Sequence, residues 1–226
     1  TCDWSSDVCS SDLQQVLDMP NLNNIHFMGG ETLLTDRFED LVDTMIAAGR
    51  FDICFSFVTN GTVYRPSLIN KLSKFRRVGI EVSIETVDDH NAYQRQGTDT
   101  KKVLSNIEKF LSHCNNDSIT VTLRPAVSAL TIGYFPDLLK YALGKKLVIK
   151  SLLVQHPKFL SAEILPDEVK LQYLEKYQCL LTELGPVQSQ NDYNASDPNN
   201  YRTIVKEQAE LCKSILQSPA PNGAEI

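Results

Sequence analysis

The sequence predicts an α/β protein built on a parallel β-sheet. Three observations lead to this prediction. Apolar stretches of strand length alternate with stretches of helical periodicity five times over, the strand stretches are nearly continuous in apolar residues, and glycine or proline stands at several boundaries. Such alternation implies helical crossovers between parallel strands. An open doubly wound sheet and a partial barrel both fit this order, and the pattern alone does not choose between them.

Five strands are expected from runs of apolar, β-branched and aromatic residues. The first run, NNIHFMGG, ends in two glycines, and the second, FDICFSFVTNG, ends in Asn-Gly, a common turn pair. The third run is VGIEVSIET, and two further runs contain ITVTL and KLVIK. The expected strands cover residues 23–30, 51–61, 78–86, 118–128 and 146–156.

Six helices are expected between and after these strands. In the first, Phe38, Leu41 and Met45 fall on one face, and Gly49 stands where the helix would end. Prolines occur near the starts of later helices, where the missing N–H costs least. The expected helices cover residues 36–49, 65–75, 98–114, 135–144, 165–185 and 201–217. Residues 187–200 are polar and predict a linker, and residues 218–226 predict a mobile tail.

Composition narrows the class of protein. The 226 residues carry a net charge of −6, which argues against a nucleic-acid partner. No apolar stretch is long enough to predict a membrane span, and the first residues lack the plan of a signal peptide. The six cysteines are too scattered for a disulfide scaffold, so a reducing, cytoplasmic location is expected.

The candidate functional residues stand at the ends of the expected strands. In parallel α/β folds the active site lies at the carboxyl ends of the strands. Small and polar residues gather there in this sequence, whereas the strand bodies are apolar. These segments are residues 28–31, 59–62, 83–86, 125–128 and 155–157.

Three of these segments, taken together, suggest a family. HFMGGETLL, FVTNGT and VSIETVDDHNAYQRQGT follow one another on successive strands, and their order resembles the radical S-adenosylmethionine (radical SAM) family, most closely members with SPASM or twitch extensions. The resemblance covers roughly residues 22–160 and implies a partial (β/α)6 barrel, here lacking its first strand. It implies an enzyme in which a [4Fe–4S] cluster cleaves S-adenosylmethionine reductively. The resulting 5′-deoxyadenosyl radical would abstract hydrogen from an unidentified peptide or small molecule, with flavodoxin or ferredoxin as reductant.

The resemblance also implies site residues. The backbone of Met28, Gly29 and Gly30 would approach the cofactor amine, and Glu31 would balance its charge or hold the turn. Arg95 would pair with the cofactor carboxylate, for which a planar guanidinium is suited. The remaining expected contacts are Asn60 on the neighbouring wall, Ser83 and Glu85 at the ribose or amino-acid part, and Ser128, His156 and Lys158 at substrate or adenine. Thr32 stands where the family usually has proline, and Glu85-Thr86 where it has Asp-Gly.

The defining cluster motif of the family, Cys-x3-Cys-x2-Cys, does not occur in the sequence. Cys2 and Cys9 are separated by six residues and have no third cysteine nearby. The surrounding stretch, DWSSDVCSSDL, resembles the in-frame translation of a common sequencing adapter, so residues 3–13 are expected to be an artefact joined to an N-terminally truncated fragment. The chain as written is therefore expected to be inactive, although its parent is an enzyme.

The expected organisation follows from this interpretation. Residues 1–13 would be disordered, residues 14–186 would form the partial barrel, and residues 187–226 would comprise the linker, last helix and tail. The strand containing Ile25 would lie at an edge of the sheet. Two alternatives remain open: a metal-free α/β barrel enzyme whose glycine turns hold a phosphorylated metabolite, and a non-catalytic scaffold of the same fold.

Overall fold

The structure, a computed structural model, describes residues 15–19, 21–114, 118–186 and 198–219. Its internal contacts divide the chain into two compact units, Thr1–Glu81 with Ser105–Val121 and Val82–Leu104 with Thr122–Ile226. The domain limits expected from the sequence are different and stay a prediction. The expectations for residues 1–13, for most of the linker and for the end of the tail lie outside the described residues.

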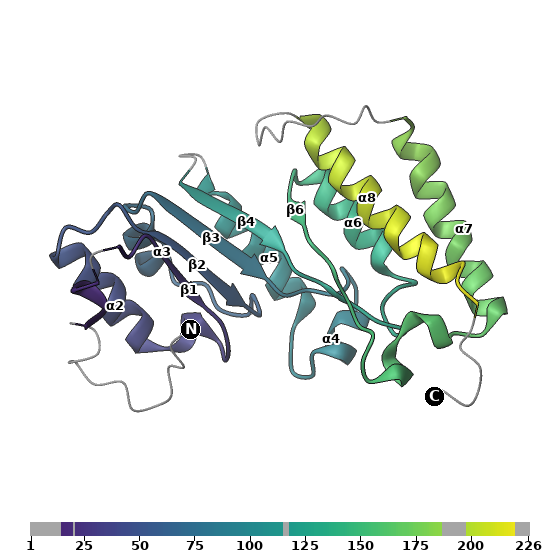
Figure 1. The fold of residues 1–226 in the computed structure, drawn as a ribbon, viewed down its shortest axis with the longest axis horizontal. Coiled ribbons are helices and arrows are strands. Elements are labelled where there is room, and N and C mark those ends of the chain that lie inside the picture. The colour runs from purple at the N-terminus through teal and green to yellow at the C-terminus, as the bar shows by residue number, and fades with distance from the viewer. Residues whose placement is uncertain (1–14, 20, 115–117, 187–197, 220–226) are drawn as a thin grey trace. The chain divides into compact units, whose positions relative to one another are not determined.

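Among the described residues, five strands form a sheet in the order β1-β2-β3-β4-β6 (Figure 1). The first three strands are β1 (Asn24–Phe27), β2 (Cys54–Thr59) and β3 (Arg77–Val82). β1 and β2 are parallel and pair from Asn24↔Cys54 to Phe27↔Phe57. Within the described part of the chain β1 is an edge strand, as expected for the strand that contains Ile25.

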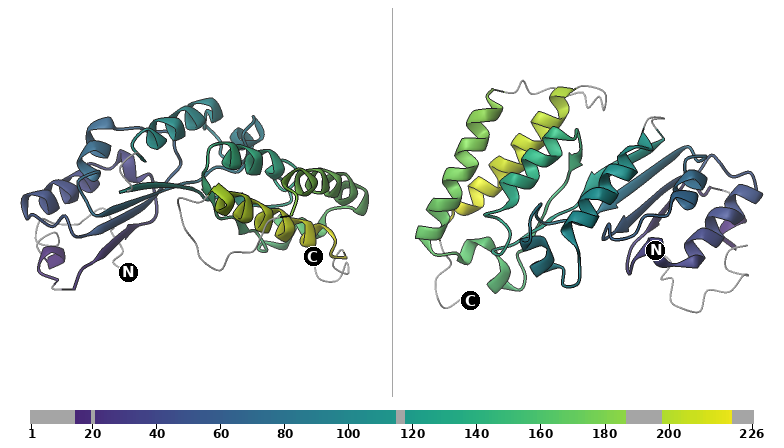
Figure 2. Two further views of the ribbon diagram at one scale, coloured as in Figure 1. Left: turned by 90° about the horizontal axis from the view of Figure 1, so that it is seen from above. Right: turned by 180° about the vertical axis from the view of Figure 1, so that it is seen from behind.

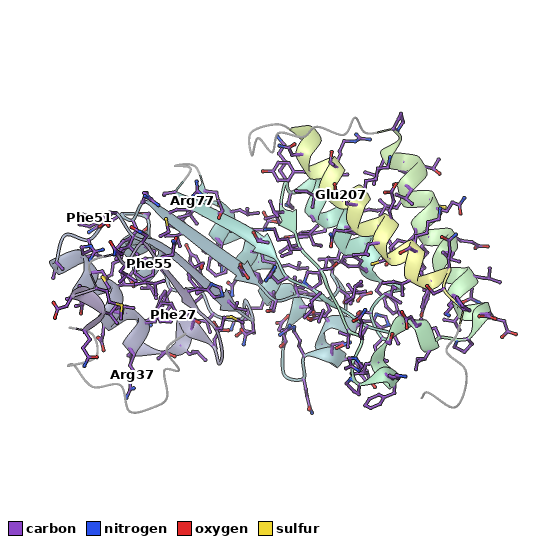
Figure 3. The ribbon with its side chains drawn as sticks, viewed as in Figure 1. Phe27, Arg37, Phe51, Phe55, Arg77 and Glu207 are labelled. Atoms are coloured by element: carbon purple, nitrogen blue, oxygen red, sulfur yellow. The ribbon has the colours of Figure 1, made fainter. Side chains whose placement is uncertain are left out.

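The core of the first unit lies between this sheet and its helices. Along β2, Phe55 and Phe57 are buried while the alternating positions are half-buried, so the aromatic residues share one face. Phe38 of helix α2 (Asp36–Ala47) meets Phe27 with ring centroids 4.8 Å apart and Phe57 at 5.2 Å. Figure 3 marks Phe27 and Phe55 on their strands. Two further helices are α3 (Pro66–Leu72) and α5 (Thr100–Leu111), and α5 begins in the second unit.

The last two expected strands are each interrupted. β4 (Ile119–Leu123) is followed by β5 (Ala126–Val127), and β6 (Val148–Ile149) by β7 (Leu152–Leu153). The register is the same on both sides of the break, because Leu123 pairs with Ile149 and Ala126 with Leu152. Pro125 lies in the break and cannot donate a ladder hydrogen bond, although its carbonyl accepts one from Leu152 at 2.8 Å. The expectation of uninterrupted strands is corrected in this detail.

The second unit ends in three helices, which Figure 2 shows from two further sides. They are α6 (Phe135–Gly144), α7 (Asp167–Leu184) and α8 (Pro198–Leu216), and α8 packs against both others. Arg202 donates to the carbonyl of Leu184 at 2.6 Å, and buried Lys170 donates to the carbonyl of Ser218 at 2.9 Å. The first bond joins the start of α8 to the end of α7, and the second joins the start of α7 to the segment just after α8. The two helices are therefore antiparallel.

Short elements that the sequence analysis missed occupy the loops. They are helix α4 (His90–Gln94) and the 3-10 turns η1 (Thr32–Leu34), η3 (Lys158–Leu160) and η4 (Ala162–Ile164). Each is too short to show a helical period in the sequence. Among the described helices, none combines the length and apolarity needed to cross a membrane.

The buried thiol of Cys212 predicts a pH effect on stability. Burial raises the pKa of this α8 side chain from 9.0 to about 12. The unfolded chain therefore loses this proton near pH 9 while the folded chain keeps it, so stability falls as pH rises through this window. We expect the difference in unfolding free energy between the wild type and Cys212→Ala to narrow between pH 8 and pH 11, measured by urea titration. A constant difference would contradict this assignment.

Candidate functional site

The Gly29-Gly30 turn leaves β1 in a backbone conformation suited to glycine. Gly29 has φ 95° and Gly30 has φ 58°, both in the left-handed region that side chains with a Cβ disfavour. A Cβ at either position would have no atom within 4 Å, so the restriction is conformational rather than steric. Met28, just before the turn, is exposed. The turn thus presents backbone groups next to an open surface of the first unit.

Glu31 joins this turn to the Thr-Asn-Gly segment after β2. Its Oε1 accepts a hydrogen bond from the Thr59 hydroxyl at 2.6 Å, and its Oε2 accepts one from the Asn60 backbone N–H at 2.7 Å. Oε1 also accepts the Leu33 N–H at 3.2 Å, which caps η1. Of the two roles expected for Glu31, these contacts support holding the turn. One carboxylate therefore fixes two of the three motif segments relative to each other within the first unit.

Asn60 shapes its own turn. Its Oδ1 accepts the backbone N–H of Thr62 at 2.9 Å and the Thr62 hydroxyl at 2.6 Å, the geometry of an Asx turn. The next residue, Gly61, has φ 73°, and its carbonyl accepts a hydrogen bond from Asn106 at 2.9 Å. Asn106 is buried on α5 and was not anticipated, because nothing in the sequence links it to a turn 45 residues earlier.

In the second unit Glu85 and Arg95 bind each other. The Nε of Arg95 donates to one carboxylate oxygen of Glu85, and Nη2 donates to the other at 2.7 Å. The Glu85 side chain is 3% exposed and that of Arg95 is 29% exposed. Both residues were expected to contact the cofactor, and the structure adds that they form an ion pair with two hydrogen bonds. Their contacts with a cofactor stay a prediction.

Asn91 completes this arrangement and was missed by the sequence analysis. It is fully buried on α4, and its Oδ1 accepts the backbone N–H of Glu85 at 2.9 Å. It stands four residues before Arg95, a spacing that puts both side chains on one face of a helical turn. A single pair of this spacing within HNAYQR does not make a helical period, so the sequence carries no clear signal for Asn91. Asn91 of α4 therefore holds the backbone of Glu85, and Arg95, the residue directly after α4, holds its carboxylate.

The other expected contacts are more dispersed. Ser128 is buried after β5, where its Oγ accepts a hydrogen bond from Gln94 of α4 at 2.9 Å. Ser83 is half-buried just after β3. His156 and Lys158 are both exposed. His156 precedes the cis peptide bond to Pro157, and Lys158 is the first residue of η3.

The described residues do not fit an iron–sulfur cluster. No group of three or more histidine, cysteine or acidic side chains among them could hold a metal ion. The described cysteines are Cys54, Cys114, Cys179 and Cys212, all with free thiols and all in or next to strands and helices. Cys2 and Cys9 lie outside the described residues.

Comparison with known proteins identifies the family. The family model of the Radical SAM superfamily matches residues 11–142, more than half of the chain. No curated protein matches the sequence. Solved structures of anSMEcpe are similar: the complex with AdoMet has 19% identity and a TM-score of 0.51 over 76% of this chain and 50% of that one.

Two other solved chains show the same range of similarity. The anSMEcpe complex with AdoMet and the Cp18Cys peptide has 20% identity and a TM-score of 0.51, over 76% of this chain and 52% of that one. Streptococcus suis SuiB bound to S-adenosylmethionine has 14% identity and a TM-score of 0.48, over 71% of this chain and 35% of that one. The chain thus spans about a third to a half of these proteins.

The predicted fold class, a parallel α/β fold of the partial-barrel type, is confirmed. The missing first strand, the truncation and the SPASM or twitch assignment stay predictions. The chain belongs to the radical SAM superfamily.

Proposed function

We propose that this chain provides S-adenosylmethionine-binding residues of a radical SAM enzyme. The observation that carries the proposal is the Glu31 carboxylate, which binds both the segment after Gly29-Gly30 and the Thr59-Asn60 segment. Two motif segments of the family are thereby held in place without a ligand, which lowers the entropic cost of binding one. The family match favours this function over a phosphate-binding barrel.

The proposed cofactor contacts are those that the family resemblance implies, each taken by itself. Backbone groups of Met28, Gly29 and Gly30 are assigned to the methionyl amine, and Asn60 to a neighbouring contact. Ser83 is assigned to the ribose or amino-acid part, and Arg95 to the carboxylate through a charge-assisted hydrogen bond. Substrate or adenine contacts are assigned to Ser128, His156 and Lys158.

The activity of the whole enzyme is a broader proposal. In the family, bound S-adenosylmethionine supplies the 5′-deoxyadenosyl radical that abstracts hydrogen from the substrate. The [4Fe–4S] cluster and a reductant such as flavodoxin or ferredoxin belong to that whole enzyme, since the described residues here do not fit the cluster. A peptide or a small molecule is the proposed substrate, and anSMEcpe was solved with a peptide bound. The free thiols of the described cysteines support a reducing compartment, the cytoplasm.

Cofactor binding by Arg95→Ala tests the proposal. We expect the chain to bind S-adenosylmethionine weakly and Arg95→Ala to lose a further 1.5–3 kcal/mol or about 10- to 150-fold in affinity, because the carboxylate loses a charged partner. Decarboxylated S-adenosylmethionine should lose less affinity through Arg95→Ala than S-adenosylmethionine does, because it has no carboxylate to pair with Arg95. Isothermal titration calorimetry measures all four affinities.

Arg202→Ala is the matched control. Arg202 belongs to the same unit as Arg95, but its side chain is bound to the carbonyl of Leu184 at the end of α7. It should leave the affinity for S-adenosylmethionine unchanged. Absence of binding by the wild-type chain would refute the proposed function. Equal affinity of the wild type and Arg95→Ala would instead show that the carboxylate binds elsewhere.

A further inference from the structure

Glu85 occupies one edge of the Arg95 guanidinium. The two donors it binds, Nε and Nη2, lie on the same side of the planar group, and each reaches a different carboxylate oxygen. A guanidinium has five N–H groups arranged as a fork, so this pairing uses two of them. The hydrogen bonds of the Arg95 guanidinium to described residues use Nε and Nη2. The Nη1 edge is therefore the part of Arg95 that remains for a second acceptor.

The Glu85 carboxylate has no other strong partner in the described chain. Its Oε1 lies 3.5 Å from the backbone nitrogen of Ala126, a weak contact at best. Because the side chain is 3% exposed, leaving this charge without Arg95 would carry a large desolvation cost. The backbone of Glu85 is fixed in turn by Asn91 at 2.9 Å. The Asn91 carbonyl also accepts a hydrogen bond from the Arg95 N–H at 2.8 Å. Asn91 thus holds the backbone of both members of the ion pair, and rotation of the guanidinium away from Glu85 is opposed by the desolvation cost.

Glu85 is linked to the segment that follows it through both its backbone and its side chain. Its N–H is bound to Asn91, and its carboxylate reaches Arg95, ten positions later. Thr86 itself is buried and donates to Asp88 at 2.8 Å, and Asp88 accepts a hydrogen bond from the N–H of His90, the first residue of α4. Glu85 and Thr86 are therefore both linked to the segment that carries α4 and Arg95.

We propose that Glu85 is a positioning residue, which binds the Nε and Nη2 groups of Arg95 and directs the Nη1 edge toward a ligand carboxylate. This assigns Glu85 a different task from direct contact with the ribose. The identity of the ligand rests on the proposed function, in which the carboxylate is that of S-adenosylmethionine. The holding of Arg95 by Glu85 does not depend on that identity and is testable without ligand.

The test uses the Nε–Hε resonances of the arginines in the whole ¹⁵N-labelled chain, observed by NMR without ligand. Loss of one resonance in Arg95→Lys assigns Arg95. In the wild type we expect its Hε to be shifted downfield and to exchange with water more slowly than those of the exposed arginines. In Glu85→Gln we expect the resonance to move to the position of exposed arginines and its exchange to become fast. Glu175→Gln, an exposed change on α7 of the same unit, should leave it unchanged.

The wild-type spectrum alone can overturn the proposal, even if Glu85→Gln fails to fold. An Arg95 Hε that exchanges as fast as those of exposed arginines would show that Glu85 does not hold it. An unchanged Hε signal in a folded Glu85→Gln protein would have the same meaning. Titration with S-adenosylmethionine and its decarboxylated analogue then separates the two claims. A protected Hε with no response to S-adenosylmethionine would support the positioning role and refute the proposed function.

Discussion

Phe57→Ala is expected to lower the free energy of unfolding of the first unit by about 3–5 kcal/mol, as for other large-to-small changes in a core. Phe57 is fully buried, and its ring lies 5.2 Å from that of Phe38 between the sheet and α2. Removing it leaves a cavity that the paired strands β1 and β2 cannot close. Urea unfolding followed by circular dichroism measures the change.

Phe51→Ala is the matched control for this prediction. Phe51 belongs to the same aromatic cluster, 6.1 Å from Phe75, but is 42% exposed. Its replacement should cost less than about 1 kcal/mol, because little apolar area returns to water. Equal losses in the two variants would mean that the interior of the first unit lies elsewhere.

Glu31→Ala is expected to cost about 1.5–3 kcal/mol of stability and to abolish measurable binding of S-adenosylmethionine. The change removes the acceptor for the buried Thr59 hydroxyl and for the Asn60 backbone N–H, which would remain without this partner. The two motif segments would then move independently, so a ligand would have to order both. Urea unfolding and calorimetric titration give the two quantities.

Glu31→Gln separates the charge of this side chain from its geometry. Glutamine keeps one carbonyl oxygen of nearly the same shape and should recover part of the stability, but it cannot accept from both segments with two oxygens. We expect binding intermediate between the wild type and Glu31→Ala. If Glu31→Ala binds S-adenosylmethionine like the wild type, the join between the two segments has no part in binding.

Much of the fold could be predicted because its signals are local. The apolar periodicity of residues 36–49 predicted α2, which begins at Asp36 and ends at Ala47. The last helix was also expected, and it begins three residues earlier than predicted, at Pro198. Hydrophobic periodicity and turn residues act over a few positions, so they can be recognised without knowing the neighbours of a segment.

The sequence predicted a set of candidate site residues but not the contacts between them. Gly29 and Gly30 were identified from a motif, and both have positive φ angles, which glycine adopts readily. Glu85 and Arg95 were predicted as cofactor contacts, and their binding to each other was not foreseen. Nothing in the spacing of ten residues shows that α4 turns the chain back, because a five-residue helix leaves no periodic signal.

The sequence by itself determined the alternation of parallel strands and helices and the residues that stand at the strand ends. Its three motif segments also indicated the radical SAM superfamily. Only the tertiary structure decided which partner each polar side chain takes: Glu31 binds Thr59 and Asn60, Asn91 binds Glu85, and Glu85 binds Arg95. The physical reason is distance along the chain. Secondary structure follows from interactions between near neighbours, whereas hydrogen bonds between loops depend on the path of every element between them.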